Sequence, residues 1–261
     1  MGTAQFRFYE ELNDFLPPDR KKIDFQYTFL GRNAIKDMIE ALGVPHPEVD
    51  LILVNGRSVD FSYIVRDGDR ISVYPVFEVF DITPLLRLRP KPLRISRFIL
   101  DVHLGRLARY LRLFGFDTLY RNDYDDAELA RLAGEQRRIL LTRDRGLLKR
   151  SSITHGYYVR ETNPRRQLRE VVARFDLYRS VRSFQRCTRC NGLLAAVAKE
   201  RILDRLGPDT QRYFDRFWRC DGCQQIYWQG SHYERLRHLI EDVLGAAGRD
   251  CCKRCRDPEP D

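Results

Sequence analysis

Residues 98–118, FILDVHLGRLARYLRLFGFDT, decide how this chain folds. The stretch begins with a short apolar run, 98–100, that ends at Asp101. Such a run is typical of a buried parallel strand whose last residue emerges at the carboxyl edge of a sheet, where open α/β sheets bind ligands. Apolar side chains then recur at helical spacing, and Gly115 is a suitable helix end. The stretch therefore predicts a strand, an acid and a helix that carries arginines.

The same alternation continues towards the C-terminus. Strand patterns occupy residues 117–120, 138–142 and 156–159, while helical patterns occupy 126–133, 145–150 and 164–175. Asn163 and Pro164 favour the start of the last of these helices. Strands that alternate with helices predict a parallel sheet with covered faces.

The first 80 residues predict a separate module. Two strand patterns precede a helix that Asn33 is expected to cap and that ends near Gly43, and two or more strands follow. This ββαββ order is that of a ubiquitin-like β-grasp domain, and residues 51–61 and 65–77 resemble the small sulfur-carrier proteins. Those proteins act through a free C-terminal Gly-Gly, whereas here the chain continues without one. We therefore expect the module to bind a protein partner rather than to transfer sulfur.

Charge divides the 261-residue chain unevenly. Residues 1–90 contain 11 Lys and Arg against 14 Asp and Glu, whereas residues 91–261 contain 35 against 23. A basic second part rich in arginine favours a nucleic-acid partner for that part; the alternative is the arginine bias of a GC-rich genome. The sequence contains no apolar run of membrane-spanning length and does not start like a signal peptide. We expect a cytoplasmic protein without a membrane partner.

All seven cysteines lie beyond residue 186. Two CxxC pairs, Cys187 with Cys190 and Cys220 with Cys223, are separated by 29 residues. This spacing predicts one tetrahedral Zn²⁺ site with a closed, structural shell of four sulfurs, and the alternative is four reduced cysteines packed as small apolar residues. A helix is expected at 202–217 between the pairs, with a strand at 225–228 and a helix at 231–244 after them. Further cysteines without a partner pair are interpreted as thiols of the tail: Cys251, Cys252 and Cys255.

Three acids stand at equivalent places in the predicted sheet. Asp101 ends the first strand, Asp126 begins a helix, and Asp144 follows the strand at 139–142. Carboxylates that converge at one edge repel each other unless a cation joins them, and oxygen ligands suit Mg²⁺ or Mn²⁺. The alternative for each acid is a helix cap. Glu128 competes with Asp126 as the ligand from that helix.

Four motifs in order carry a family resemblance. They are ILDVHLGRLARYLRLFGFDTLY at 99–120, DDAELARLA at 125–133, RRILLTRDRGLLKR at 137–150 and FWRCDGCQQIYWQGSHYERL at 217–236. Together they resemble the PIN-like ribonucleases of the Mut-seven C-terminal RNase family, whose members end in a zinc ribbon and also occur behind a β-grasp module. The resemblance implies a PIN-like α/β fold and metal-dependent hydrolysis of RNA, with Asp101, Asp126 and Asp144 as catalytic metal ligands. His103 departs from the acid or small residue often expected at its position.

The phosphates of RNA need cationic partners. We expect contacts from Arg106, Arg109 and Arg143, although the alternative for each is an ordinary solvated side chain. Four aromatic residues near the second CxxC pair are candidates for stacking on bases, with the core of the ribbon as the alternative: Trp218, Tyr227, Trp228 and Tyr233.

The sequence thus predicts an α/β protein of several parts. A ubiquitin-like β-grasp domain (1–82) precedes a PIN-like parallel-sheet domain (96–184), a zinc ribbon with flanking helices (185–244) and a disordered tail (245–261). The predicted function is that of a metal-dependent ribonuclease with catalytic Mg²⁺ or Mn²⁺ and structural Zn²⁺. The alternative is a non-catalytic protein that binds RNA or acts as an adaptor.

Overall fold

A computed structural model describes residues 1–75 and 96–254, with side chains as far as residue 245. The segment between the predicted β-grasp and PIN-like domains (83–95) lies outside the described residues, as do the side chains of the tail cysteines. The chain divides into two compact units, each of which is described by itself. The first contains Met1–His103 and Asn122–Val159, and the second contains Leu104–Arg121 and Arg160–Asp261.

The N-terminal part of the first unit is a β-grasp domain. Its sheet has the order β2-β1-β5-β3-β4, in which β1 and β5 are parallel and the other pairs are antiparallel. The ubiquitin-like architecture predicted from the sequence is therefore confirmed. Its elements are β1 (Gly2–Phe8), β2 (Phe25–Phe29), α1 (Ile35–Ala41), β3 (Leu51–Val54), β4 (Arg57–Val59) and β5 (Arg70–Tyr74), with 3-10 turns at Glu10–Phe15, Pro18–Arg20 and His46–Glu48.

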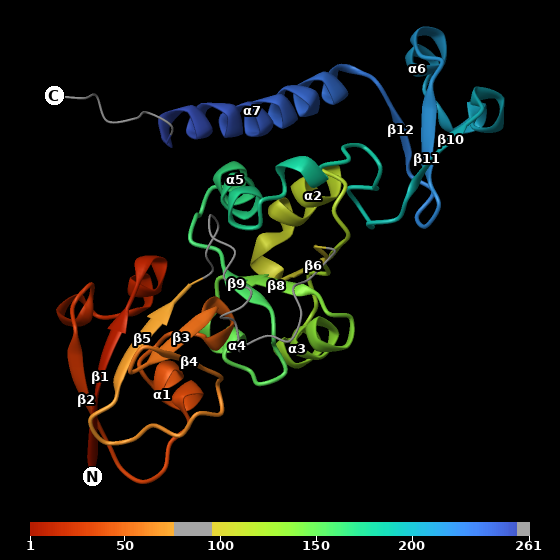
Figure 1. Ribbon diagram of the computed structural model, residues 1–261. Helices are drawn as coiled ribbons and strands as arrows, with labels where there is room; N and C mark the ends of the chain where they lie inside the picture. The colour runs from red at the N-terminus through yellow and green to blue at the C-terminus, as the bar shows by residue number, and fades with distance from the viewer. Residues whose placement is uncertain (76–95, 255–261) are drawn as a thin grey trace, which may run out of the picture. The chain divides into compact units, whose positions relative to one another are not determined.

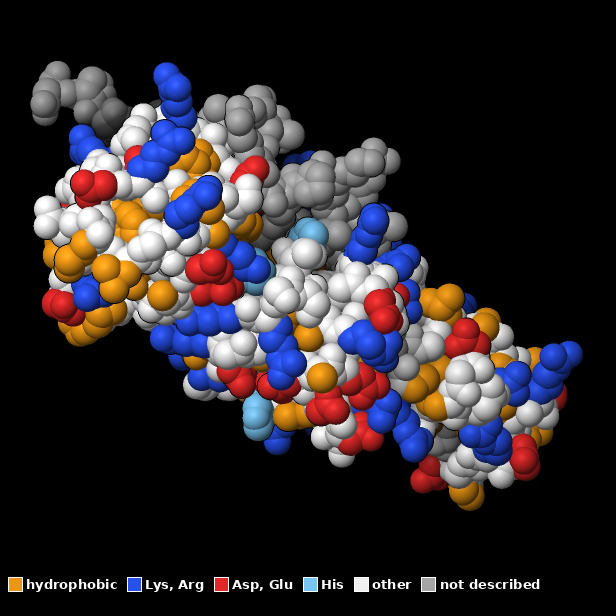
Figure 2. Space-filling view, turned by 90° about the horizontal axis from the view of Figure 1, so that it is seen from below, with side chains coloured by type: hydrophobic (Ala, Val, Ile, Leu, Met, Phe, Trp, Pro, Cys, Tyr) orange, Lys and Arg blue, Asp and Glu red, His pale blue; other side chains and the backbone are white. Residues whose placement is uncertain are grey.

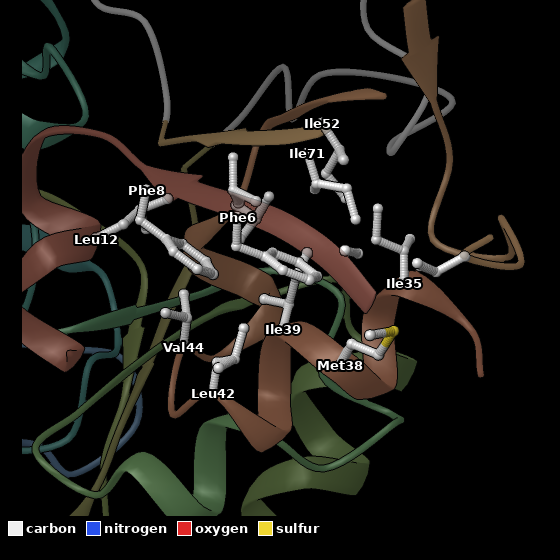
Figure 3. Close-up of a cluster of buried hydrophobic side chains, with 14 of the residues drawn as sticks. Phe6, Phe8, Leu12, Ile35, Met38, Ile39, Leu42, Val44, Ile52 and Ile71 are labelled. Carbon is white, nitrogen blue, oxygen red and sulfur yellow. The ribbon is translucent and has the colours of Figure 1, made fainter. Parts of the chain in front are cut away.

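Period-two alternation in β1 builds the core of this domain. Phe6 and Phe8 point to the same face of the sheet and are almost completely buried. Figure 3 shows them against Ile35 and Ile39, which lie one helical turn apart on α1. Burial of these four side chains fixes the helix across the sheet, and each contributes about 1.5–3 kcal/mol relative to an exposed position.

The predicted cap of α1 is wrong. Ala34 is the N-cap residue, and the side chain of Asn33 instead donates a hydrogen bond to the carbonyl oxygen of Leu30 at 2.8 Å. The amide of Asn33 thus stabilises the turn before the helix, one residue too early to reach the first helical N–H groups.

Three parallel strands belong to the rest of the first unit (Figure 1). The strands β6 (Phe98–Leu100), β8 (Ile139–Thr142) and β9 (Gly156–Tyr158) lie in the spatial order β6-β8-β9, with α3 (Asp126–Glu135) packed on β6 and β8 and α4 (Arg145–Leu148) packed on β8 and β9. Every residue of β6 and β8 is buried. The sequence prediction of buried parallel strands is confirmed, and it places the residues after β6 and β8 at one edge.

The β-grasp domain contacts this sheet within the first unit. The buried carboxylate of Glu48 accepts a hydrogen bond from the backbone N–H of Tyr158 in β9. His46 lies with its Nε2 2.8 Å from the carbonyl oxygen of Ile153, and the ring of Phe15 packs on that of Tyr158 with centroids 5.6 Å apart. The front module thus contacts a backbone N–H group of β9 and a carbonyl oxygen just before that strand.

The second unit combines helices with a zinc-ribbon sheet. Helix α2 packs on α5, and the ribbon strands pair antiparallel in the order β10-β11-β12. Gly115, at φ +94°, ends α2 as predicted, because the left-handed conformation suits glycine. The elements are α2 (Gly105–Leu113), β7 (Thr118–Leu119), α5 (Pro164–Arg174), β10 (Leu194–Val197), α6 (Pro208–Tyr213), β11 (Phe217–Cys220), β12 (Ile226–Trp228) and α7 (Ser231–Arg254), with 3-10 turns at Tyr178–Ser180, Lys199–Arg201 and Leu203–Arg205.

Two expectations for this unit are wrong. The single helix predicted at 202–217 is broken into 3-10 turns and the short α6, because Pro208 holds Gly207 in an extended conformation. Helix α7 does not end at 244 but continues to Arg254, so residues 245–254 are helical rather than disordered.

No helix in the described part of the chain combines the length and the apolar character that a membrane crossing requires.

The contact between His46 and the sheet predicts a pH-dependent stability. Burial lowers the pKa of His46, and this effect outweighs the opposing hydrogen bond with Glu40, whose Oε1 lies 2.6 Å from Nδ1. Lys36 also disfavours the charged ring. The folded state favours the neutral imidazole more than the unfolded chain does. The contribution of His46 to the free energy of unfolding is therefore fully present above about pH 6.5 and is lost as the pH falls further.

Urea unfolding at about pH 7.5 and about pH 5.5 checks this prediction. The unfolding midpoint of the wild type should fall more between the two conditions than that of His46→Gln. His238→Gln, which changes an exposed histidine of α7, should behave like the wild type. An equal fall in all three proteins would exclude His46 as the titrating group.

Candidate active site and nucleic-acid interface

Asp101 stands at the end of β6 and is 6% exposed. Its backbone N–H donates to the carbonyl oxygen of Leu141 at 3.1 Å, which extends the parallel ladder by one residue. Its Oδ2 accepts a hydrogen bond from the hydroxyl of Thr142 at 2.8 Å. Within the described part of the chain, this carboxylate forms no salt bridge with a basic side chain and accepts no hydrogen bond from a backbone N–H group. A buried carboxylate with one neutral partner is costly, and a bound cation would offset that cost.

Thr142, the last residue of β8, links two of the predicted acids. Its buried Oγ1 donates to Asp101 and accepts the backbone N–H of Asp144 at 2.9 Å. The sequence analysis did not single out Thr142, although a hydroxyl that ends a buried strand two residues before an acid was a signal that could have found it. One hydroxyl therefore fixes the side chain of the first acid relative to the backbone of the second.

Asp144 is the N-cap of α4. Its Oδ1 accepts from the backbone N–H groups of Gly146 at 2.6 Å and Leu147 at 3.3 Å. Its Oδ2 has no hydrogen-bond partner among the residues that the structure describes. Because a carboxylate has two oxygens and about four lone-pair positions, the capping role and a ligand role are compatible for this residue.

Asp126 is the first residue of α3, and the cap of that helix is its neighbour Asp125, whose Oδ1 accepts from the N–H of Glu128 at 2.7 Å. The side chain of Asp126 is 51% exposed and lies 3.7 Å from Nη2 of Arg150. The capping alternative thus applies to Asp125 rather than to Asp126. Whether Asp126 or the half-buried Glu128 is the ligand from α3 stays open.

The acids do not form a closed cluster. Among the described residues, one group of three or more potential ligand atoms lies within 4.8 Å of one another, and it consists of cysteines. The structure links Asp101 to Asp144 through Thr142 but does not bring Asp126 into the same group. The metal-ligand role of the three acids remains a prediction. His103, next to Asp101, is exposed.

The four cysteines of the two CxxC pairs do come together. The Sγ atoms of Cys187 and Cys223 lie 3.6 Å apart, and those of Cys190 and Cys220 lie 3.3 Å apart. Each pair makes the same turn, in which the first cysteine exchanges backbone hydrogen bonds with the residues four and five positions later. The residue four positions later, Asn191 or Gln224, has positive φ. This set of four sulfurs fits the closed tetrahedral shell of a structural Zn²⁺.

The protonation of this cluster indicates how a metal would stabilise it. Burial raises the pKa of Cys220 to about 12. Burial also pushes the pKa of Cys190 upward, but hydrogen bonds from the Gly192 amide and from neighbouring cysteines lower it to about 7. A metal that binds here would therefore displace a proton from Cys220, whose thiol otherwise stays neutral at pH 7. Burial raises the pKa of Tyr227 to about 12 as well, so its hydroxyl, 3.1 Å from Sγ of Cys187, stays protonated and is able to donate to a thiolate there.

Arg112 attaches the first cysteine turn to α2. Its guanidinium is 3% exposed and donates to the carbonyl oxygens of Thr118 at 2.9 Å and Arg189 at 2.8 Å. This arginine is thus a structural element of the second unit. Arg106 and Arg109, on the same helix, are exposed instead.

Arg106 and Arg109 line a cavity of about 470 Å³ in the second unit, which we call the arginine groove. Arg165 of α5 and Arg235 of α7 line it too. All four side chains are exposed, and none forms a salt bridge with any described residue. The sequence analysis missed Arg165 and Arg235, because only tertiary packing brings these separate helices together. Four cations without anionic partners around one cavity suit a ligand that carries several phosphates.

Arg143, the third predicted RNA contact, belongs to the first unit. Its Nη1 donates to the carbonyl oxygen of Val159 at 3.0 Å, so part of the guanidinium is already bound to backbone. Figure 2 shows basic and acidic side chains interspersed on the visible face. Net charge alone therefore does not locate an RNA-binding surface, and particular arginines identify it instead.

Two family models match the chain. Residues 96–240 match the model of the Mut7-C RNAse domain, and residues 1–81 match that of the Mut7-C ubiquitin domain. The chain belongs to the Mut7-C RNase family. The resemblance that the four motifs predicted is confirmed, together with the order of a ubiquitin-like domain before a Mut7-C RNase domain. No curated protein and no solved structure matches the chain.

The family match includes the features described above. The Mut7-C RNase region contains Asp101, Thr142, Asp144, the arginine groove and the four cysteines. The Mut7-C ubiquitin region contains η3, the 3-10 turn at His46–Glu48 that contacts β9. The chain is thus a member of a ribonuclease family with an added ubiquitin-like domain.

Removal of a cysteine tests the zinc site. We expect about one zinc ion per wild-type chain and substantially less in Cys220→Ser, because three sulfurs leave the tetrahedral shell open. The second unit should then unfold more readily, since structural zinc supplies on the order of 10 kcal/mol in isolated zinc fingers. Metal analysis and thermal unfolding measure both effects. Cys252→Ser, which changes a tail cysteine, should retain zinc; retention in Cys220→Ser would contradict the assignment.

Replacement of Thr142 tests the link between the two acids. Thr142→Val keeps the shape of the side chain but removes the donor to Asp101 and the acceptor for the Asp144 amide. We expect a loss of about 1–3 kcal/mol in the free energy of unfolding, because buried polar groups lose their partner. Thr142→Ser should retain most of the stability. If urea unfolding gives the same midpoint for both variants, the hydroxyl does not make this link.

Proposed function

We propose that this chain is a metal-dependent ribonuclease in which Asp101, Asp126 and Asp144 hold Mg²⁺ or Mn²⁺. The observation that carries the proposal is the buried carboxylate of Asp101, which has a threonine hydroxyl but no described cation as its partner. Membership of a ribonuclease family supports RNA as the substrate.

The donor set fits such an ion. Hard divalent cations prefer carboxylate oxygens, and both Asp101 and Asp144 retain one oxygen without a described hydrogen-bond donor. When bound, the ion would lower the pKa of a water molecule and shield the charge of the attacked phosphodiester. Thr142 would hold the Asp101 side chain in one orientation, and the N-cap bonds would do the same for Asp144.

The arginines would position the substrate. A guanidinium presents paired donors that match the geometry of a phosphate, so Arg106, Arg109 and Arg143 are proposed to contact the RNA backbone. The Zn²⁺ of the four cysteines would be structural, because a closed shell of four sulfurs leaves no position for substrate. We place the protein in the cytoplasm and propose a protein partner for the ubiquitin-like domain.

A second candidate function is RNA binding without cleavage. The observation in its favour is that the ligand atoms of the described acids do not gather within 4.8 Å of one another, whereas the four arginines of the groove line one cavity. In that case the β-grasp domain would recruit a partner and the second unit would hold the RNA. The two functions differ in the fate of the RNA.

Isosteric replacement of the acids tests the catalytic role. Asp101→Asn, Asp126→Asn and Asp144→Asn each remove one negative charge with little change of shape. We expect Mn²⁺-dependent cleavage of a labelled single-stranded RNA to fall about 100-fold or more, which corresponds to about 3 kcal/mol of transition-state stabilisation. Because Asn is as good an N-cap as Asp, Asp144→Asn should keep α4 and the overall stability.

Asp125→Asn is the matched control. It removes a charge from the residue next to Asp126 but preserves the cap of α3, so cleavage should be close to that of the wild type. Full activity in Asp101→Asn and Asp144→Asn would refute the catalytic assignment. RNA binding by a wild type that never cleaves would support the adaptor function instead.

A further inference from the structure

A second cavity, of about 660 Å³, adjoins the arginine groove in the second unit. Its volume is in the usual range for ligand pockets. The two cavities share the lining residues Leu113, Thr188, His232 and Leu236, so they lie side by side on the second unit. We call the second one the aromatic cavity, because five rings line it: Phe184, Trp218, Tyr227, Trp228 and Tyr233.

Two of these rings lie on the face of the ribbon sheet that is opposite its core. The ribbon core contains Phe217 and Ile226, which pack with residues of the 3-10 turns. Trp218 alternates with Phe217 along β11 and pairs across the strands with Tyr227. Trp218 and Tyr227 therefore point away from the ribbon core. The alternative considered for them, that they build that core, is not what the structure shows.

The cavity has both fixed and accessible rings. Tyr227 is held from behind by its hydroxyl contact with the sulfur of Cys187. Phe184 and Tyr233 pack on each other with ring centroids 4.5 Å apart. Trp218 is half-buried and stacks on no other ring in the described part of the chain, and Trp228 is 38% exposed. The neighbouring rings are held by their own contacts, and the ring face of Trp218 has no described stacking partner. That face is therefore available to a flat ligand.

The adjoining cations identify the class of ligand. An apolar peptide would fit the rings but would leave the four arginines of the groove without a partner. Single-stranded RNA supplies both components at a fixed spacing, because every nucleotide joins a flat base to a phosphate. In a duplex the bases are stacked and paired, so their faces are not free to enter a cavity.

We propose that the aromatic cavity binds an unpaired nucleobase of single-stranded RNA whose phosphates lie along the arginine groove. This inference rests on the proposed function in taking RNA as the ligand, and it adds the single-stranded form and the place where a base is held. The ring face of Trp218 stacks on the base, while Arg235 and its neighbours contact the backbone. Structured duplex RNA lacks the free base and binds more weakly.

Tryptophan fluorescence reports on this site directly. The chain has two tryptophans, Trp218 and Trp228, and both line the cavity. The titration uses the full chain with Asp144→Asn, so that the RNA is not cleaved, and an oligouridylate of about eight nucleotides, which is the length of a typical single-strand site. An abasic oligonucleotide of the same length carries the same phosphates without bases. We expect quenching and tight binding with the first probe, and weak binding without quenching with the second.

Substitutions separate the two parts of the site. Trp218→Leu should weaken oligouridylate binding about 5- to 100-fold, as the loss of stacking on one base would require. Tyr213→Leu is the matched control, because Tyr213 is 66% exposed on α6 and lines no part of the cavity. Zinc content measured in both variants confirms that the ribbon stays folded.

Two arginines of α7 form a second matched pair. Arg235 lines the groove without a described anionic partner, whereas Arg237 pairs with Glu234 and Glu241. Arg235→Gln should weaken binding and reduce the slope of log affinity against log salt by about 0.7–1, because one phosphate contact is lost. Arg237→Gln should leave both quantities nearly unchanged.

The results distinguish this proposal from the ribonuclease proposal. Equal binding and quenching by the abasic probe, or wild-type affinity in both Trp218→Leu and Arg235→Gln, would overturn the base site even if cleavage occurs. Quenching by an amphipathic peptide but not by RNA would overturn it as well. Base-dependent binding that requires Trp218, in a wild type that does not cleave RNA with Mn²⁺, would refute the catalytic function and support the base site.

Discussion

The buried guanidinium of Arg112 is the interaction on which the second unit depends. It lies on α2 but donates to the backbone of Thr118, just beyond that helix, and to the backbone of Arg189, inside the first cysteine turn. A buried charge needs partners, and the carbonyl oxygens around this planar guanidinium supply several of them. Because the cysteine turn is fixed on α2 in this way, the groove beside α2 and the cavity beside the ribbon become parts of one surface.

Thr142 has a comparable role in the first unit. Parallel pairing of β6 with β8 brings Asp101 beside Thr142, which comes two residues before Asp144. The Thr142 hydroxyl donates to the Asp101 carboxylate and accepts from the backbone N–H of Asp144. A side chain with one O–H and two lone pairs is suited to that position, whereas a carboxylate or an amine is not. One carboxylate oxygen of each acid has no described hydrogen-bond donor, so the arrangement supports a cation site without completing one.

Local patterns in the sequence predicted most of the fold. The apolar runs at 98–100 and 139–142 became buried parallel strands, Asn163 caps α5, and the CxxC pairs converge. These features depend on neighbours in the chain, which periodicity and spacing describe. The broken helix at 202–217 was missed because apolar residues on both sides of Pro208 gave a helical pattern that hid the effect of the proline. The long α7 was missed because the composition after 244 gave no periodic stripe.

The candidate site was predictable only in part, for a different reason. Asp101 and Asp144 could be found because strand ends share an edge, but the partner of each acid could not. Asp125 takes the cap that Asp126 was equally able to make, and Arg112 is buried although its spacing matches the exposed Arg109. The separate helices that supply Arg165 and Arg235 meet through tertiary packing, which no local pattern records.

Charges without partners connect the two halves of the functional argument. Folding normally pairs a buried carboxylate or neutralises it, yet Asp101 has a hydroxyl as its described partner; the four exposed arginines of the groove likewise lack described anions. Arg237, two residues after Arg235 on α7, forms salt bridges with two glutamates. Arginines of this helix are thus neutralised at one position and left without a described anion at another. A divalent cation would complete the first group, and a polyanion would complete the second. The proposed metal-dependent cleavage of RNA uses both ligands, and the two kinds of unpaired charge therefore support the same proposal.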